Sequence, residues 1–416
     1  MKNFLVHDDN TRSEMLNSVG LKYITDLFKQ IPEAARLAQI ELENPISEMD
    51  VQKRIKALAK KNKTDVISFL GGGVYNKFVP ACVSQIANRF EFLTAYTPYQ
   101  AEIAQGTLQI MYEFQTMMCR LTGMDISNAT VYDGATACAE AILMAVRIQK
   151  KDKVLVSKNI NPEYLKVIKT YAWAGEIGVE EFDKLPSDTK DYACVLVQTP
   201  DYYGELTEIT KPYDTLLIVC TDISSLSILK PPAEYGADIV VGDIQGLGIP
   251  MNFGGPHAGI IACKEKYMRQ MAGRLAGRTV DKDGNQAFTL TIQTREQHIK
   301  REKATSNICS NQALIGLCAA VYLSVMGEKG FRQTGYLSAK NAHKLSEKLA
   351  AIGIKTLNRN FYNEFVIQVE NSGKILETLK QNNIIGGLKL DDTKILIAAT
   401  EMISDEDIDL YVKSLL

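Results

Sequence analysis

Residues 242–259 read GDIQGLGIPMNFGGPHAG. This glycine-rich turn follows the short apolar run ADIVV and leads into a second one, GIIAC. Short apolar runs bounded by such turns are typical of buried strands in a parallel sheet, and such sheets bind their ligands beyond the carboxyl ends of the strands. The stretch therefore lies where many α/β enzymes hold a cofactor, yet it contains no lysine.

The surrounding sequence extends this pattern. Between residues 66 and 328, the apolar runs KVLVS, YACVLVQTP and TLLIVCTD alternate with the helical patterns ATACAEAILMAVRIQKK and PEYLKVIKTYAWAG. Strands that alternate with helices predict an α/β large domain with a mainly parallel sheet covered on both faces. The pattern restarts in residues 329–416, which predict a smaller C-terminal α+β domain, whereas the charged residues 1–65 predict a helical N-terminal arm.

Composition narrows the class of function. The chain has 416 residues, 47 basic and 49 acidic residues and a net charge of -2, which indicates neither a nucleic-acid nor an anionic-lipid partner. No uninterrupted apolar run reaches the roughly 18 residues of a membrane span, so we expect a cytoplasmic protein. The 8 cysteines form no CxxC pair and the 4 histidines form no HExxH motif, so we expect no metal site.

Two further places could contact a cofactor. Gly134, Ala135 and Thr136 open a helix whose free N–H groups could hold a phosphate, although the adjacent Asp133 would repel an anion and could instead cap the helix. Asp222 ends a strand, where its carboxylate could pair with a protonated ring nitrogen or could simply stabilise a turn.

Together these features suggest the large domain of a fold type I pyridoxal-phosphate enzyme. Such enzymes hold the resting cofactor as a Schiff base to a lysine in the glycine-rich turn. Here the turn offers Gln245, Gly246 and Leu247, and we interpret Lys230 and Lys264, which are out of register, as surface lysines.

Four long motifs carry a specific family resemblance: FLTAYTPYQAEIAQGTLQIMYEFQTMMCRLTGM, ATVYDGATACAEAILMA, GDIQGLGIPMNFGGPHAG and LTIQTREQHIKREKATSNICSNQAL. They resemble the glycine cleavage system P protein, glycine dehydrogenase (decarboxylating), in its α-subunit (subunit 1) form. The resemblance implies that a β subunit (subunit 2) holds pyridoxal phosphate on its lysine, that Gly246 stands at the lysine's place in this chain, and that this chain completes the partner's active site.

The resemblance also implies the reaction and the partners. Glycine loses CO2, and its aminomethyl group passes to the lipoyl arm of H protein. The implied assembly is an α2β2 heterotetramer. Two other hypotheses stay open: a non-catalytic scaffold or regulatory subunit, and an independent pyridoxal-phosphate transferase that uses another lysine, such as Lys230.

Residues 94–102, TAYTPYQAE, are the first candidate contribution to the partner's site. Tyr96, Thr97, Tyr99 and Gln100 supply hydroxyl and amide groups without helical amphipathicity. The resemblance suggests that they contact glycine or the arriving lipoyl arm. Alternatively, this loop packs only within its own subunit.

Residues 301–307, REKATSN, are the second candidate. Thr305, Ser306 and Asn307 could clamp the phosphate of the partner's cofactor or could cap the following helix, ALIGLCAAVYL. Just before them, Glu296 and Lys300 have the spacing of a helical ion pair, either on a solvated face or at the β-subunit interface. His257 could stack near the cofactor position or could be structural.

Overall fold

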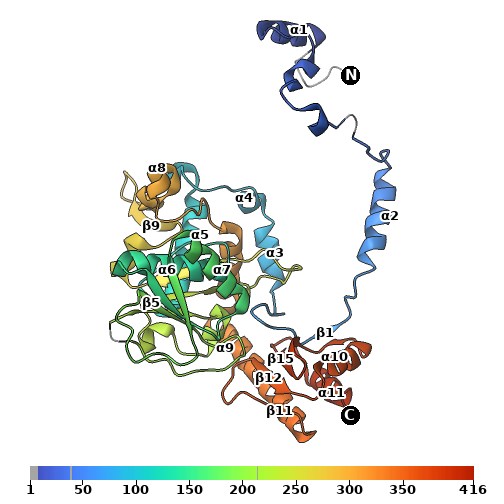
Figure 1. The fold of residues 1–416 in the computed structure, drawn as a ribbon, viewed down its shortest axis with the longest axis vertical. Coiled ribbons are helices and arrows are strands. Elements are labelled where there is room, and N and C mark those ends of the chain that lie inside the picture. The colour runs from blue at the N-terminus through green and yellow to red at the C-terminus, as the bar shows by residue number, and fades with distance from the viewer. Residues whose placement is uncertain (1–7, 38–39, 213) are drawn as a thin grey trace. The chain divides into compact units, whose positions relative to one another are not determined.

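The computed structural model describes residues 8–37, 40–212 and 214–416, which divide into two compact units between residues 64 and 65. The larger unit contains a seven-stranded sheet of order β2-β8-β7-β6-β5-β3-β4. Its strand β5 is labelled in Figure 1. Neighbouring strands from β7 through β4 run parallel, and β8 is antiparallel to both of its neighbours. The predicted mainly parallel sheet is confirmed. Its strands are β2 Ile126–Ser127, β3 Lys153–Ser157, β4 Gly178–Phe182, β5 Cys194–Gln198, β6 Leu216–Cys220, β7 Ile239–Asp243 and β8 Gly259–Cys263.

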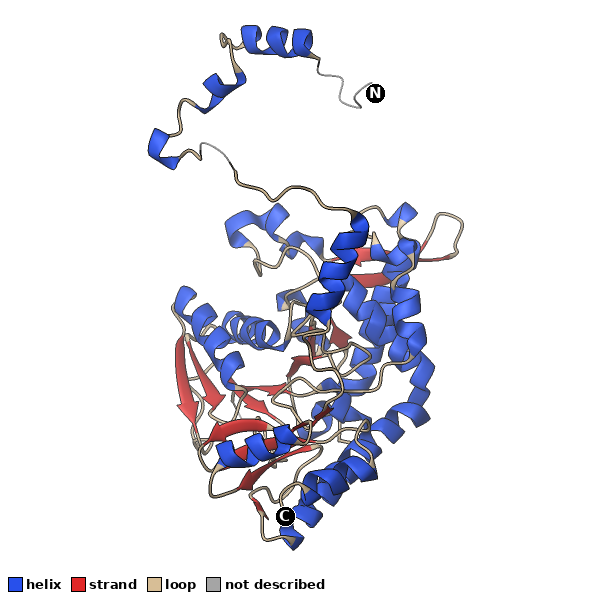
Figure 2. Ribbon diagram, turned by 90° about the vertical axis from the view of Figure 1, so that its right-hand side faces the viewer, coloured by secondary structure: helices blue, strands red, loops and turns tan. Residues whose placement is uncertain are grey.

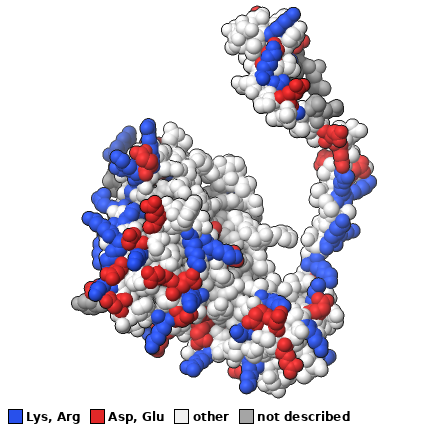
Figure 3. All heavy atoms as spheres, in the orientation of Figure 1, with Lys and Arg blue, Asp and Glu red and all other residues white. Residues whose placement is uncertain are grey.

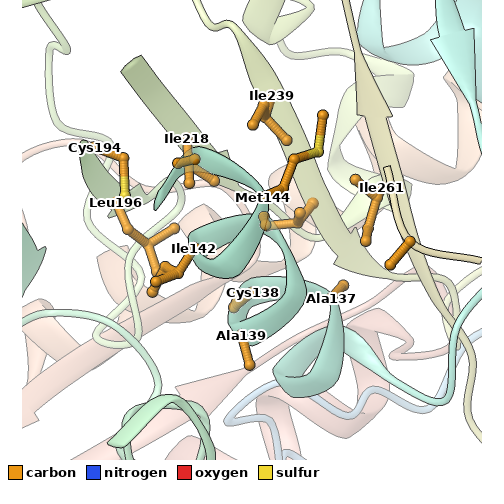
Figure 4. Packing of buried hydrophobic residues seen from close by; sticks show 14 of the residues in the cluster. Ala137, Cys138, Ala139, Ile142, Met144, Cys194, Leu196, Ile218, Ile239 and Ile261 are labelled. Atoms are coloured by element: carbon orange, nitrogen blue, oxygen red, sulfur yellow. The ribbon is translucent and has the colours of Figure 1, made fainter. Parts of the chain in front are cut away.

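Helices cover both faces of this sheet, as the alternation of side chains along the strands requires. On β7, Val241 packs with α6 (Gly134–Gln149) and α7 (Pro162–Ala174), whereas the adjacent Val240 packs with α5 (Gln105–Thr122) and α9 (Ala313–Ala351). Figure 4 shows side chains of α6 pointing toward Ile218, Ile239 and Ile261 of three strands. The central strands β6, β7 and β8 are buried on both faces, which explains why their sequences are almost continuously apolar, whereas the edge strand β4 has no buried residue.

A second, antiparallel sheet lies in the C-terminal part of this unit and has the order β11-β12-β15-β14. Its apolar core is closed by the second half of α9 and by α10 and α11 (Figure 1). β1, from residues 67–68, pairs in parallel with β13, so Ile67 lies opposite Ile384. The elements are β1 Ile67–Ser68, β11 Lys355–Thr356, β12 Glu364–Gln368, α10 Ser372–Gln381, β13 Ile384–Ile385, β14 Leu388–Asp391, β15 Lys394–Ala398 and α11 Asp405–Lys413.

Helix α9 joins these two parts. Gly327 has φ +59 and interrupts the helical path, so α9 consists of two segments. The predicted boundary between a large and a small domain, at residues 328/329, falls directly after this break, and that division stays a prediction. Within the described residues, α9 is the helix whose length and composition would allow it to cross a membrane. Part of its apolar surface, including Ile315, Ala319 and Tyr322, packs into the core of the sheet.

Shorter elements complete the larger unit. A hairpin of β9 and β10 packs against α5, and the charged segment after it contains only short helical turns. Figure 2 shows the helices and strands in a second orientation, and Figure 3 shows acidic and basic side chains interspersed over the visible face. These elements are α3 Ala81–Ala87, α4 Phe90–Leu93, β9 Leu275–Val280, β10 Gln286–Thr291 and α8 Gln297–Lys300.

The smaller unit contains α1 (Asp9–Ser18), two 3-10 turns and α2 (Glu48–Ala59). Its helices are specified locally: the Asp8 carboxylate accepts from the Thr11 N–H, and the Ser47 hydroxyl accepts from the Asp50 N–H. None of its described residues is buried. Residues 1–7 and 38–39 of the predicted arm lie outside the described residues.

Gly204 connects the central sheet with the C-terminal sheet by a close backbone approach. It has φ +87, and a Cβ there would overlap the carbonyl oxygen of Glu364. We predict that Gly204→Ala lowers the free energy of unfolding by about 2–4 kcal/mol, since it adds a steric overlap to the left-handed strain. Chemical denaturation measures this loss.

Gly284→Ala is the matched control. Gly284 has a similar φ of +83, but no atom lies within 4 Å of the added Cβ. This variant carries only the backbone strain, about 1 kcal/mol. Equal losses in the two variants would show that the close approach to Glu364 is unimportant.

Candidate functional site

The carboxyl ends of β5, β6 and β7 meet at a small polar cavity. Its volume is about 40 Å³, which by the usual requirement of about 10–15 Å³ per water is space for a few water molecules. Asp222, Asp243 and Gly246 line it from the ends of β6 and β7, and Tyr75 and Glu364 line it from the opposite side. The remaining lining residues are Gly73, Asn161, Tyr164, Gln198, Pro200, Cys220, Thr221, Gln245 and Asn363. This is the position at which the sequence predicted a cofactor loop.

The glycine-rich turn is packed without space for a side chain at residue 246. The buried Gln245 side chain donates to the carbonyl oxygens of Tyr75 and Ile249 at 3.0 and 2.8 Å and accepts from the Tyr75 N–H at 3.0 Å. A Cβ on Gly246 would lie 2.9 Å from both Cβ and Oγ of Ser224. The turn has glycine where a lysine would stand, and its packing leaves no room for a Cβ there unless Ser224 shifts.

Two of the three N–H groups that could hold a phosphate are already bonded within the chain. Asp133 is the N-cap of α6, and its carboxylate accepts from the Thr136 N–H at 2.7 Å. The Gly134 N–H donates to Asp243 at 3.2 Å. The capping alternative for Asp133 is thus what the structure shows, and two carboxylates occupy two of the donors that a phosphate would need.

Asp222 also has its partners within the chain. Its two oxygens accept from the Ser224 N–H at 3.0 Å and the Ser224 hydroxyl at 2.7 Å, which makes it the cap of the following 3-10 turn. Burial raises the pKa of Asp222 above its ordinary value, and the nearby Lys77 opposes this rise. The turn-stabilising alternative therefore describes the observed contacts of Asp222.

His257 is paired and does not lie free beside the cavity. Its Nδ1 lies 3.1 Å from the Asp243 carboxylate, and this hydrogen bond raises the pKa of the imidazole. The structural role proposed for His257 is the one that its contacts support.

These residues do not fit pyridoxal phosphate. The cavity is too small for a substituted pyridine ring with its phosphate, the turn has no amine at Gly246, and the helix donors are bonded to Asp133 and Asp243. No catalytic step can therefore be assigned to a cofactor held at this position.

The segment 94–102 lies away from this cavity, and none of its residues lines it. Tyr96 and Gln100 are exposed, with 72% of Tyr96 accessible. Thr97 Oγ1 lies 2.9 Å from Ser310 Oγ, and the Tyr99 hydroxyl accepts from Arg274 at 2.8 Å. The structure thus anchors Thr97 and Tyr99 and presents Tyr96 and Gln100 at the surface.

Residues 305–307 do not cap the long helix, so that alternative was wrong. Helix α9 begins at Ala313, and its N-cap, Gln312, makes no side-chain hydrogen bond. Ser306 instead donates to the buried Glu140 at 2.6 Å, and the Thr305 N–H donates to the Arg295 carbonyl. Asn307 is exposed. The polar residues of the irregular stretch 304–312 resemble a capping signal, but the chain turns again before the helix begins.

The buried Arg274 links the first candidate segment with residues that flank the second, and the sequence analysis missed it. Its guanidinium donates to Glu296 at 2.6 Å, to the Tyr99 hydroxyl and to the carbonyl of Cys309. The expected Glu296–Lys300 ion pair is therefore wrong, because Glu296 pairs with Arg274, 22 residues away. An arginine within the otherwise apolar stretch MAGRLAG was the available signal, but its partners are distant in the sequence.

Two lysines outside the glycine-rich turn bear on the hypothesis of an independent pyridoxal-phosphate transferase. Lys230 is exposed. Lys264 pairs at 2.7 Å with Asp238, which directly precedes β7 and so lies at the opposite end of that strand from the cavity. Neither lines the cavity. Both positions agree with their interpretation as surface lysines.

Comparison with known proteins gives concordant similarities. The family model described as "Glycine cleavage system P-protein" matches residues 2–415. The probable glycine dehydrogenase (decarboxylating) subunit 1 of Carboxydothermus hydrogenoformans is 46% identical, over 98% of this chain and 98% of the relative. A crystal structure of inhibitor-bound glycine decarboxylase (P-protein) has a TM-score of 0.90 at 38% identity, with 99% of both chains covered.

A more distant similarity concerns the fold alone. A C-DES variant with glycine linked covalently to its PLP cofactor has a TM-score of 0.60 at 13% identity, covering 85% of this chain and 96% of the other. The α/β architecture is thus that of fold type I pyridoxal-phosphate enzymes.

Arg274 generates a prediction about local order. In Arg274→Met the buried Glu296 loses its cationic partner, which costs about 3 kcal/mol of unfolding free energy. Residues 94–104 lose an anchor, and their amide hydrogens exchange faster in hydrogen–deuterium exchange. Arg278→Met is the control, because Arg278 is an exposed arginine on β9, which begins directly after Arg274; this variant leaves exchange unchanged. Unchanged exchange in both variants would contradict the anchoring role.

Glu364 generates a prediction about pH. Burial raises its pKa to about 7, partly offset by hydrogen bonds from the Gly72 N–H and the Tyr75 hydroxyl. The folded state then holds a proton that the unfolded chain releases, so stability is lost as pH rises from about 4.5 to about 7. Glu364→Gln cannot titrate, and its stability relative to the parent chain rises by about 3 kcal/mol between pH 4 and 8. Urea unfolding at both pH values measures this, and parallel profiles would refute it.

Proposed function

The chain belongs to the glycine cleavage system P-protein family, and on that premise we propose that it is the glycine decarboxylase subunit that completes an active site carried by a second subunit. The pair decarboxylates glycine, releases CO2 and transfers the aminomethyl group to the lipoyl arm of H protein. The β subunit holds pyridoxal phosphate, and the assembly is an α2β2 tetramer. We place this complex in the cytoplasm.

The closed cavity beside Gly246 is the observation that carries this proposal. A chain of this family needs pyridoxal phosphate, and this chain has neither the amine nor the free phosphate donors to hold it. The relatives named "subunit 1" support a partner subunit that supplies both. The division places the covalent chemistry on the partner and leaves substrate positioning to this chain.

This chain's contribution comes from the segment anchored by Arg274. Tyr96 and Gln100 stand exposed on a loop whose neighbours Thr97 and Tyr99 are fixed by hydrogen bonds. A rigid loop with exposed polar groups can orient a small polar substrate and exclude water when a partner covers it. We assign Tyr96, Thr97, Tyr99 and Gln100 to the substrate side, and Thr305, Ser306 and Asn307 to the phosphate side, of the partner's site.

Glycine-dependent exchange of labelled CO2 tests the proposal, with H protein and pyridoxal phosphate present. We expect exchange from the mixture of this chain and subunit 2, and none from either alone. Exchange by this chain alone would contradict a shared site, and borohydride reduction with peptide mapping would then identify its lysine. Full exchange by subunit 2 alone would favour the scaffold hypothesis.

The same exchange assay tests whether the exposed side chains of Tyr96 and Gln100 contact the substrate. Tyr96→Phe combined with Gln100→Ala lowers turnover by about tenfold or more, as expected when hydrogen bonds of about 1 kcal/mol each are lost from the substrate. The complex still assembles by gel filtration. Tyr203→Phe, another exposed tyrosine, is the control and retains full turnover. Full turnover of the double variant would remove the segment from the site.

A further inference from the structure

Lys77 is a buried cation close to the glycine-rich turn. Its side chain is 4% exposed, and its Nζ lies 3.7 Å from Glu401 Oε2 and 3.5 Å from Ser338 Oγ. It also lies over the ring of Tyr362, 5.6 Å from the centroid. Lysine is rarely buried unless it is paired, so this position needs a physical reason.

The stem of Lys77 passes the place where a lysine of the turn would begin. A Cβ on Gly246 would lie 3.5 Å from Lys77 Cδ, in addition to its close approach to Ser224. Lys77 therefore fills space beside residue 246 from a different part of the chain, the segment before α3.

The ammonium group faces the Glu401 carboxylate, whose side chain is also only 4% exposed. Burial lowers the pKa of Lys77, but the neighbouring Tyr362, Glu401 and Asp222 outweigh this and leave its pKa above the ordinary value. Reciprocally, Lys77 opposes the rise in the pKa of Asp222. The other charged groups nearby are already engaged: Asp243 with His257, and Glu364 with Gly72 and Tyr75.

In a cofactor-bearing enzyme of this fold, an aspartate at this strand end pairs with the protonated ring nitrogen of pyridoxal phosphate. A buried carboxylate without any cation would be costly. We propose that Lys77 is an internal counter-charge beside this position: it compensates the buried Glu401 and fills the space beside Gly246, so that the position is closed to pyridoxal phosphate in the folded chain. This inference does not depend on the proposed function.

A double-mutant cycle at pH 8 tests the charge role without any activity measurement. Lys77→Met keeps a similar shape and removes the charge, and we expect it to raise the unfolding equilibrium constant roughly tenfold or more. In the Glu401→Gln background the same substitution has a clearly smaller effect, because the carboxylate that lies 3.7 Å from the Lys77 Nζ is gone. Equal effects in both backgrounds would show that Lys77 only packs and would overturn the proposal.

A second test uses the unmodified full-length chain, so it does not depend on whether a substituted chain folds. It is incubated with pyridoxal phosphate, reduced with borohydride and mapped by peptide mass spectrometry, with the chain unfolded in urea as the matched control. We expect Lys77 to be labelled only in the unfolded chain. Labelling of Lys77 in the folded chain would overturn the proposal that this position is closed to pyridoxal phosphate. Neither result decides whether subunit 2 needs this chain.

Discussion

The distance between Gly246 and Ser224 is the constraint on which the rest of this sheet edge depends. Because a Cβ at residue 246 would lie 2.9 Å from Ser224, the turn after β7 packs directly on the turn after β6. Gln245 then reaches Tyr75, and Tyr75 reaches Glu364 of the C-terminal sheet. One small residue thus lets three parts of the chain meet where other members of the fold hold a ligand.

The polar residues discussed above form an inner and an outer region. The inner one, around Asp222 and Asp243, is saturated by bonds within the chain. The outer one, around Arg274, leaves polar side chains such as Tyr96 exposed while fixing the backbone that carries them. The chain thus combines a bonded interior at the ends of β6 and β7 with a defined polar surface at residues 94–102.

Much of the fold was predictable from the sequence, since strands buried on both faces are continuously apolar and Asp133 lies in the ordinary sequence context of a helix cap. The family also followed from long ordered motifs. The partners of Arg274 and Lys77 were not predictable, because Glu296 and Glu401 are brought to them by tertiary folding and a local pattern carries no such information. The polar residues 305–307 misled for the same reason, because Ser306 bonds to the distant Glu140 and none of the three caps α9.

The pairing of β1 with β13 has a consequence for synthesis. Ile67 and Ile384 come from nearly opposite ends of the larger unit, and Phe69 packs against Tyr411 in the same core. The C-terminal core therefore closes only after almost the entire chain has left the ribosome. Until then, residues 67–69 lack the backbone partners that residues 383–398 provide, and the emerging polypeptide must remain soluble with one of its cores open. Loss of even the last helix would leave the beginning of this unit without its packing surface.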